Sequence, residues 1–175
     1  KMAAESGVDA FIVQDWGCIY LIKKCVPNAV LHASTQMTIH TPEGAEFAKS
    51  LGFSRIVPAR ELPAENIAEI SKHIPETEIF IHGALCMSVS GQCYFSAMIG
   101  SRSANRGVCG QVCRLPFSSC GAKNFSALSL KDLSLLNHIK NMNNICSLKI
   151  EGRMKRPEYV ASAVIETKKA LSGQA

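Results

Sequence analysis

Short apolar runs typical of buried strands alternate along this chain with segments of helical periodicity. The predicted strands cover residues 9–13, 29–33, 55–57, 78–81 and 146–150. The predicted helices cover residues 41–51, 64–73, 130–142 and 157–171, and residues 2–6 are typical of the end of a further helix. Strands that alternate with helices indicate a parallel sheet with right-handed crossover connections. We therefore predict an α/β fold with five strand–helix units.

Composition limits the class of protein. The chain has 175 residues, of which 47% are hydrophobic and 19% charged, as is ordinary for one globular domain. We find no linker and no internal repeat, and we expect a single domain over residues 1–175. The net charge of +5 is compatible with RNA or an anionic metabolite as partner and selects neither. Lys1 is not an initiator, so we expect a piece of a longer protein.

Targeting signals and cysteine use indicate the compartment. No apolar run reaches the roughly 18–20 residues that span a bilayer, and no charged-then-apolar leader opens the chain. We therefore expect a cytoplasmic protein with no membrane partner. Eight cysteines without a leader favour reduced thiols or metal ligands over a disulfide framework.

Polar residues gather at the carboxyl ends of all five predicted strands. They are Gln14 and Asp15, Ser34 to Gln36, Arg60 and Glu61, His82, and Lys149 to Arg153. Alternation along the fifth strand places Lys149, Glu151 and Arg153 on one face. Because ligands bind at this edge of parallel sheets and barrels, we predict a binding site there. The alternatives are that these residues cap helices and turn loops, or form an internal salt-bridge network.

A long cysteine-rich loop is predicted at about 84–127. It contains Cys86, Cys93, Cys109 and Cys113 in the pattern Cys-x6-Cys-x15-Cys-x3-Cys, with frequent glycine, serine and arginine. Structural cysteines lie in hydrophobic runs, whereas a thiolate in a glycine-punctuated loop is free to ligate metal or react. Loops of this length are usually functional, so we predict that the loop is the chemical centre.

The same residues resemble a known family. The segments that carry the resemblance are Glu78–Cys86, Ser90–Ser96, Arg102–Gly107, Cys109–Arg114, Ser129–Leu133 and Ser147–Met154, with Asp9–Asp15, Ala33–Gln36 and Pro58–Leu62 upstream. They are similar to the collagenase-like peptidase family, peptidase family U32, nearly from end to end. The resemblance implies a parallel TIM-like barrel, of which this chain would cover the last five βα units.

Two functions follow from the resemblance. The family name implies a peptidase acting on collagen-like or other peptides. Other members are RNA hydroxylation proteins that act on a tRNA uridine or an rRNA cytidine, with an iron–sulfur cluster and a prephenate requirement. We take cluster-dependent RNA hydroxylation as the leading hypothesis and a peptidase as the alternative. A third possibility is a fragment without activity.

The resemblance implies Cys86, Cys93 and Cys109 as cluster ligands, with Cys113 as the fourth. Four thiolates suit a [4Fe–4S] or [2Fe–2S] centre. Zinc is the main rival, although paired Cys-x2-Cys knuckles are absent. Cys120 and Cys146 are alternatives for the fourth ligand, and Cys18 and Cys25 are expected to be bystanders.

Peptidase chemistry has weaker support in the residues themselves. The chain has neither a His-Glu-x-x-His zinc helix nor a Gly-x-Ser-x-Gly elbow. His82 and Cys86 are candidates for a Cys–His pair with a cysteine nucleophile. Such a pair lacks an orienting third group and leaves three cysteines unexplained.

The remaining polar residues receive predicted roles at the strand ends. Lys149, Arg153, Arg60 and His82 have the charge to bind a dianion such as prephenate. Glu61 and Glu151 are candidates to orient those cations or, with His82, to act as acid or base. Gln36 is a candidate for a hydrogen bond to substrate. Arg102, Arg106 and Arg114 flank the cysteines, where they would contact RNA phosphates or offset thiolate charge.

Overall fold

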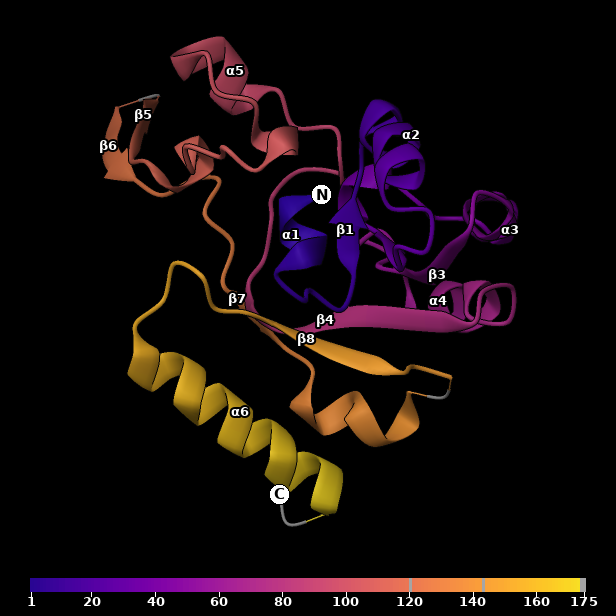
Figure 1. Cartoon of the computed structure of the whole chain (residues 1–175). Helices are drawn as coiled ribbons and strands as arrows, with labels where there is room; N and C mark the ends of the chain where they lie inside the picture. The colour runs from indigo at the N-terminus through magenta and orange to yellow at the C-terminus, as the bar shows by residue number, and fades with distance from the viewer. Residues whose placement is uncertain (120, 143, 174–175) are drawn as a thin grey trace.

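The computed structural model describes residues 1–119, 121–142 and 144–173 and contains a mostly parallel sheet (Figure 1). The parallel strands are β1 (Phe11–Val13), β2 (Leu31–Ala33), β3 (Phe53–Ile56), β4 (Glu76–Ala84) and β8 (Ser147–Glu151). They are ordered β1-β2-β3-β4-β8, and β7 (Asp132–Ser134) pairs antiparallel with the end of β4. A mixed α/β fold is confirmed. The described strands do not close into the predicted TIM-like barrel.

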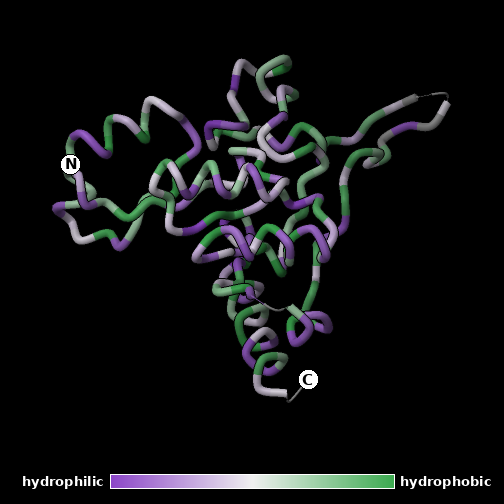
Figure 2. The backbone as a smooth tube through the Cα atoms, turned by 90° about the vertical axis from the view of Figure 1, so that its right-hand side faces the viewer, coloured by the Kyte–Doolittle hydropathy of each residue, from purple (hydrophilic) through white to green (hydrophobic). Residues whose placement is uncertain are grey.

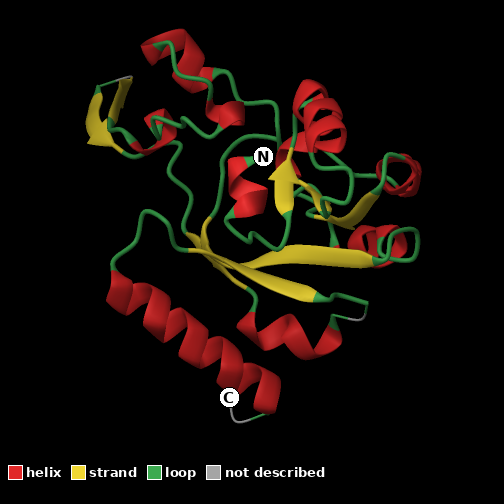
Figure 3. Cartoon of the chain, in the orientation of Figure 1, coloured by secondary structure: helices red, strands yellow, loops and turns green. Residues whose placement is uncertain are grey.

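Several helices of the chain pack against one face of this sheet. The α-helices are α1 (Met2–Glu5), α2 (Trp16–Cys25), α3 (Pro42–Ser50), α4 (Ala64–Ile70), α5 (Phe95–Gly100) and α6 (Pro157–Ser172). The 3-10 helices are η1 (Thr35–Met37), η2 (Ala104–Arg106), η3 (Val112–Arg114) and η4 (Leu136–Asn141). Figure 3 shows α3 and α4 beside one end of the sheet, and η4 and α6 beneath β4 and β8.

The core lies between the sheet and these helices. Leu31 and Phe53 pack with Ala45 and Ala48 of α3 in one buried cluster. A second cluster joins Ile79, Ile81, Ile139 and Ala170. Alternation along β4 turns Ile79 and Ile81 toward the helices and places Glu78, Phe80 and His82 on the opposite face. Burial of the apolar face thus fixes which side chains the other face presents.

Three parts of the predicted secondary structure need correction. Residues 130–142 do not form one helix, because residues 132–134 pair with β4 as β7 and only the following residues turn into η4. The loop at 84–127 contains α5, η2, η3 and a hairpin of β5 (Phe117–Ser119) and β6 (Ala122–Phe125). Helix α2 is absent from the sequence prediction, although Asp15 caps it by accepting a hydrogen bond from the Cys18 N–H at 3.0 Å.

The hairpin projects from the rest of the chain. Figure 2 shows it reaching away from the body on the side opposite the N-terminal segment. The side chains of Phe95 and Phe117 stack at its base, with ring centroids 6.4 Å apart. The whole excursion from β4 to β7 therefore lies outside the sheet and its helical layer.

Candidate functional site: a cavity lined by four cysteines

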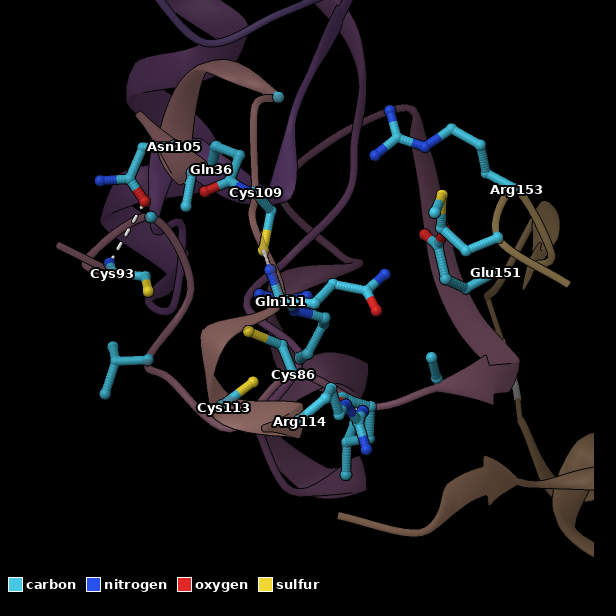
Figure 4. A pocket seen from close by; sticks show the side chains of 18 of the residues that line it. Gln36, Cys86, Cys93, Asn105, Cys109, Gln111, Cys113, Arg114, Glu151 and Arg153 are labelled. Carbon is cyan, nitrogen blue, oxygen red and sulfur yellow. Dashed lines mark hydrogen bonds between the residues drawn. The ribbon is translucent and has the colours of Figure 1, made fainter. Parts of the chain in front are cut away.

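A cavity of about 230 Å³ lies where the carboxyl end of β4 meets the cysteine segment, which we define as residues 85–131. The four cysteines of the predicted ligand set line it: Cys86, Cys93, Cys109 and Cys113. Gln36, Arg60, Glu151, Arg153 and Lys155 contribute to the wall from the ends of β2, β3 and β8. Figure 4 shows the cysteine side chains across the cavity from Glu151 and Arg153. The cavity thus occupies the strand edge at which α/β proteins bind ligands.

Ser90 anchors the cysteine segment to the sheet edge. It is fully buried, at 0% exposure, between the first two cysteines of the cavity. Its hydroxyl and its backbone N–H donate to the two oxygens of Glu61 at 2.8 and 3.0 Å. The backbone N–H of Arg60 donates to Ser90 Oγ at 3.1 Å, and Thr38 Oγ1 donates to the Ser90 carbonyl at 2.7 Å. Side chains that follow β2 and β3 therefore hold one residue of the segment.

These hydrogen bonds also set the charge of Glu61. Burial favours the neutral carboxyl group, but the hydrogen bonds from Ser90 and the nearby Arg60 charge outweigh it, so the pKa of Glu61 is lowered. Glu61 does not line the cavity, and its carboxylate faces Ser90. Its predicted role as an acid or base stays a prediction.

Two further hydrogen bonds hold the cysteine segment to itself. The N–H of Cys93 donates to Asn105 Oδ1 at 3.2 Å. The N–H of Gly110 donates at 3.0 Å to the hydroxyl of Ser96, which is buried at 2% exposure. The backbone is thus fixed at one cysteine and beside another, because Gly110 follows Cys109 directly.

Arg114 ties the two ends of the cysteine segment together. Its Nη2 donates to the carbonyl of Leu85 at 2.6 Å, and its Nη1 donates to Ser129 Oγ at 2.9 Å and to the carbonyl of Leu130. None of these three acceptors carries a charge. Its expected role in offsetting thiolate charge stays a prediction.

The four thiols are free and line the same cavity. Burial raises the pKa of Cys113, with further increases from Cys86 and Cys109 and an opposing effect from Arg114. The N–H of Gln111 donates to Cys109 Sγ at 3.3 Å. Within the described ranges, no three His, Cys, Asp or Glu side chains lie close enough to hold one metal ion.

The other cysteines lie elsewhere. Cys146 donates from its thiol to the carbonyl of Thr77 at 3.2 Å, outside the cavity. Cys18 and Cys25 are exposed on α2. Cys120, the other alternative for the fourth ligand, lies outside the described residues.

The cavity is rich in positive charge. Its lining includes Arg60, Arg114, Arg153 and Lys155, whereas Glu151 is the carboxylate among the described lining residues. Such an excess of cations favours an anionic occupant, whether a thiolate-ligated cluster or an acidic small molecule. Gln36 adds a polar group, because its Oε1 is shielded from solvent and has no hydrogen-bond partner within the described residues.

His82 and Lys149 are not among the residues that line the cavity. The ring of His82 packs 5.6 Å from that of Tyr159, and its Nδ1 is buried without a partner among the described residues. The described hydrogen bonds do not join His82 to Cys86. Lys149 donates to Glu78 Oε1 at 2.9 Å in a network that includes Arg55 and Ser147. For Lys149 the geometry matches the salt-bridge alternative, and its role in substrate binding stays a prediction.

Sequence reasoning missed one polar cluster beside the cavity. Asp132 Oδ2 accepts hydrogen bonds from Lys155 Nζ at 2.6 Å and from the Tyr159 hydroxyl at 2.8 Å. Burial and the Asp132 carboxylate raise the pKa of Tyr159 to about 12. Lys155 lies shortly after the polar run from Lys149 to Arg153, which is the signal in the sequence that points to it. Asp132 lies within Ser129–Leu133, one of the segments that carry the family resemblance, but the helix predicted over 130–142 gave it no place at the cavity.

Comparison with known proteins shows to which family this chain is similar. A family model described as "Peptidase family U32" matches residues 1–173. The 23S rRNA 5-hydroxycytidine C2501 synthase of Escherichia coli is 42% identical over 176 residues, which cover 95% of this chain and 26% of that protein. The tRNA hydroxylation protein P1 of Bacillus subtilis is 36% identical over 186 residues, covering 98% of this chain and 44% of that protein.

Proteins named for proteolysis match as well. A collagenase of Porphyromonas gingivalis is 34% identical over 180 residues, covering 90% of this chain and 43% of the collagenase. The solved structure of a U32 peptidase superposes with a TM-score of 0.51 at 15% identity, covering 89% of this chain and 59% of that one. This chain therefore spans less than half the length of these three curated relatives. No helix in the described part of the chain is long and apolar enough to cross a membrane.

Proposed function

This chain belongs to peptidase family U32, and we propose that it carries the iron–sulfur site of an RNA hydroxylation protein. The observation that supports this most is the gathering of four free cysteines around one cationic cavity at the carboxyl edge of parallel strands. Relatives at 36–42% identity carry names of RNA hydroxylation proteins, which supports an RNA substrate and a cytoplasmic location. The complete protein would close the sheet into a TIM-like barrel.

Cys86, Cys93, Cys109 and Cys113 would hold the cluster, and four thiols suit a [4Fe–4S] centre. The bound cluster would supply one-electron redox chemistry. Arg114 would offset its negative charge while keeping the two ends of the cysteine segment together. The cavity wall opposite the thiols would remain available for substrate.

The remaining wall residues would bind and orient the reactants. Arg60 and Arg153 would pair with the carboxylates of an acidic co-substrate such as prephenate. Gln36 would use its unpartnered Oε1 to accept a hydrogen bond from substrate. Glu151 lines the cavity and also lines a small neighbouring cavity together with His82, so these two would move protons. Lys149 would act at longer range through Glu78.

A peptidase remains the second candidate, because a collagenase is among the relatives and the family takes its name from proteolysis. In that case Cys86 would be the nucleophile and His82 its base. The contacts of His82 argue against this pair, because its ring packs on Tyr159 and no described hydrogen bond links it to Cys86. The peptidase also leaves the other three cysteines of the cavity without a function.

Iron and acid-labile sulfide measured after purification without oxygen distinguish the two candidates. We expect about four irons and four sulfides per chain, with broad visible absorption, for a cluster held by four thiolates. Cys86→Ser and Cys93→Ser should lose both, whereas Cys25→Ser, at an exposed position on α2, should keep them. Full iron and sulfide in both cavity variants would disprove the ligand assignment. A colourless protein whose peptide cleavage is lost in Cys86→Ala would support the peptidase.

RNA hydroxylation is tested in cells that lack the gene for the full-length protein. Nucleosides of their tRNA and rRNA should lose a hydroxylated pyrimidine, which the wild-type gene restores and the Cys93→Ser gene does not. Unchanged nucleosides in the deletion strain would rule out RNA as the substrate.

A further inference from the structure

We propose that Glu61 and Ser90 form a clamp that holds the backbone between Cys86 and Cys93 in place, which makes Glu61 a positioning residue for these two thiols. The clamp comprises these two residues with Arg60 and Thr38, all in hydrogen-bond contact. It acts on the protein chain itself and needs no bound group.

The hydrogen-bonding capacity of the Ser90 hydroxyl is fully used. A serine hydroxyl has one hydrogen to donate and two lone pairs to accept. The hydrogen goes to Glu61 Oε2 at 2.8 Å, and the lone pairs face the backbone N–H and the Nε of Arg60 at 3.1 and 3.3 Å. Thr35 Oγ1, 3.3 Å from the hydroxyl, has the Pro58 carbonyl as its own acceptor at 3.1 Å. An acceptor is therefore required on the Glu61 side.

This requirement distinguishes glutamate from glutamine at position 61. The carboxylate offers one acceptor oxygen to the Ser90 hydroxyl and the other to the Ser90 N–H. A glutamine amide can accept only through its oxygen and must present its NH2 group to one of these two donors. One buried hydrogen bond is then lost whichever way the amide is turned.

The backbone at Gly91, next to the clamp, lies very close to Gln36 and Thr38. Gly91 has φ +74°, and a Cβ there would overlap the Gln36 carbonyl oxygen and lie 2.5 Å from Thr38 Oγ1. Thr38 Oγ1 also accepts a hydrogen bond from Gln92 Nε2 at 3.3 Å. Residues 90–92 therefore lie directly against the end of β2, and the cysteine on either side has a short tether.

A clamped backbone keeps Cys86 and Cys93 facing the cavity when no group is bound. Both thiols are half-buried, whereas Cys18 and Cys25 are exposed on α2, away from the clamp. Loosening the clamp should raise the reactivity of the first pair and leave the second pair unchanged. This comparison within one chain separates a local effect from general unfolding.

The first test measures alkylation of the full-length protein after reduction and removal of metal by a chelator. Iodoacetamide labelling is followed for each cysteine peptide by mass spectrometry. In Glu61→Gln and Ser90→Ala we expect Cys86 and Cys93 to label about tenfold faster relative to Cys18 and Cys25, because losing buried hydrogen bonds increases local opening. The matched controls are Glu69→Gln and Ser50→Ala, whose hydrogen bonds lie on the exposed surfaces of α4 and α3.

Unchanged labelling ratios in both folded variants would overturn the clamp. If either variant fails to fold, Thr38→Val decides the matter, because it removes the hydrogen bond to the Ser90 carbonyl and leaves Glu61 in place. A raised ratio in Thr38→Val supports the clamp, and an unchanged ratio overturns it.

The second test rests on the proposed function, because it uses the cluster. We expect Glu61→Gln to retain less iron and sulfide than Glu69→Gln and to show an altered visible spectrum, both measured at a temperature where each variant is folded. Equal spectra and equal iron in the two variants would contradict the positioning role. If the wild-type protein holds no iron, the proposed function fails and the labelling ratios still decide the clamp.

Discussion

Replacing Gly91 with alanine tests the close approach of the cysteine segment to the sheet edge. Gly91 has φ +74°, where an L-residue costs about 1–2 kcal/mol. The new methyl group would also overlap the carbonyl oxygen of Gln36 and press on Thr38 Oγ1. Forcing such a contact apart costs typically about 1–3 kcal/mol. We therefore expect Gly91→Ala to lower the free energy of unfolding by about 2–5 kcal/mol.

Gly107→Ala is the matched control. Gly107 has φ +83°, but a Cβ there meets nothing within 4 Å, so only the backbone cost applies. Thermal denaturation compares the two variants, at about 2–4 °C per kcal/mol for a chain of this size. Gly91→Ala should melt at least about 2 °C below Gly107→Ala, since the contact adds about 1–3 kcal/mol. Equal melting temperatures would show that the segment does not lie against β2 as described.

Three further outcomes follow from the packing and the charges. Ile81→Ala, at a position with 0% exposure, should cost about 2–5 kcal/mol in urea denaturation, and a cost below about 1 kcal/mol would contradict its place in the core. Asp132→Asn should lower the pKa of Tyr159 from about 12 toward its ordinary value, as followed by ultraviolet titration; an unchanged titration would exclude the Asp132 contact. Burial alone would raise the pKa of Glu78, but the hydrogen bonds from Lys149, Ser147 and Arg55 outweigh burial, and the pKa is lowered. The ionised Glu78 therefore stabilises the fold at pH values above its unfolded pKa. This stabilisation is lost as the pH falls through the folded pKa. Lys149→Met should therefore move acid unfolding to higher pH, and an unmoved midpoint would refute the pairing.

The five parallel strands and most of the α-helices could be predicted because their signals are local. The apolar run from Ile79 to Ile81 marks β4, and Thr41 followed by Pro42 marks the start of α3 by capping. The segment from 130 to 142 could not be predicted in this way. Its leucines fit a helical period, but pairing of β7 with β4 overrides that preference.

The candidate site also contains residues that local sequence signals predict and residues that they do not. Cys86, Cys93, Cys109 and Cys113 stand out by spacing, and strand-end reasoning located Gln36 and Arg60, all of which line the cavity. Ser90 hydrogen-bonds to Glu61 and Lys155 to Asp132, and in each pair the two residues are far apart in the sequence. No local sequence pattern predicts these contacts. Separations of 29 and 23 residues put such pairs beyond any periodicity.

The two ends of the cysteine segment leave the sheet at the same place. Ala84 and Asp132 are register partners in the antiparallel pair of β4 and β7. The cysteine segment thus leaves the sheet and returns to it at neighbouring positions. If it were removed, a short turn would be enough to join β4 to β7. The cysteine segment should accordingly be exchangeable between homologues, provided that Glu61 and Thr38, which hydrogen-bond to it from outside the segment, are transferred together with it.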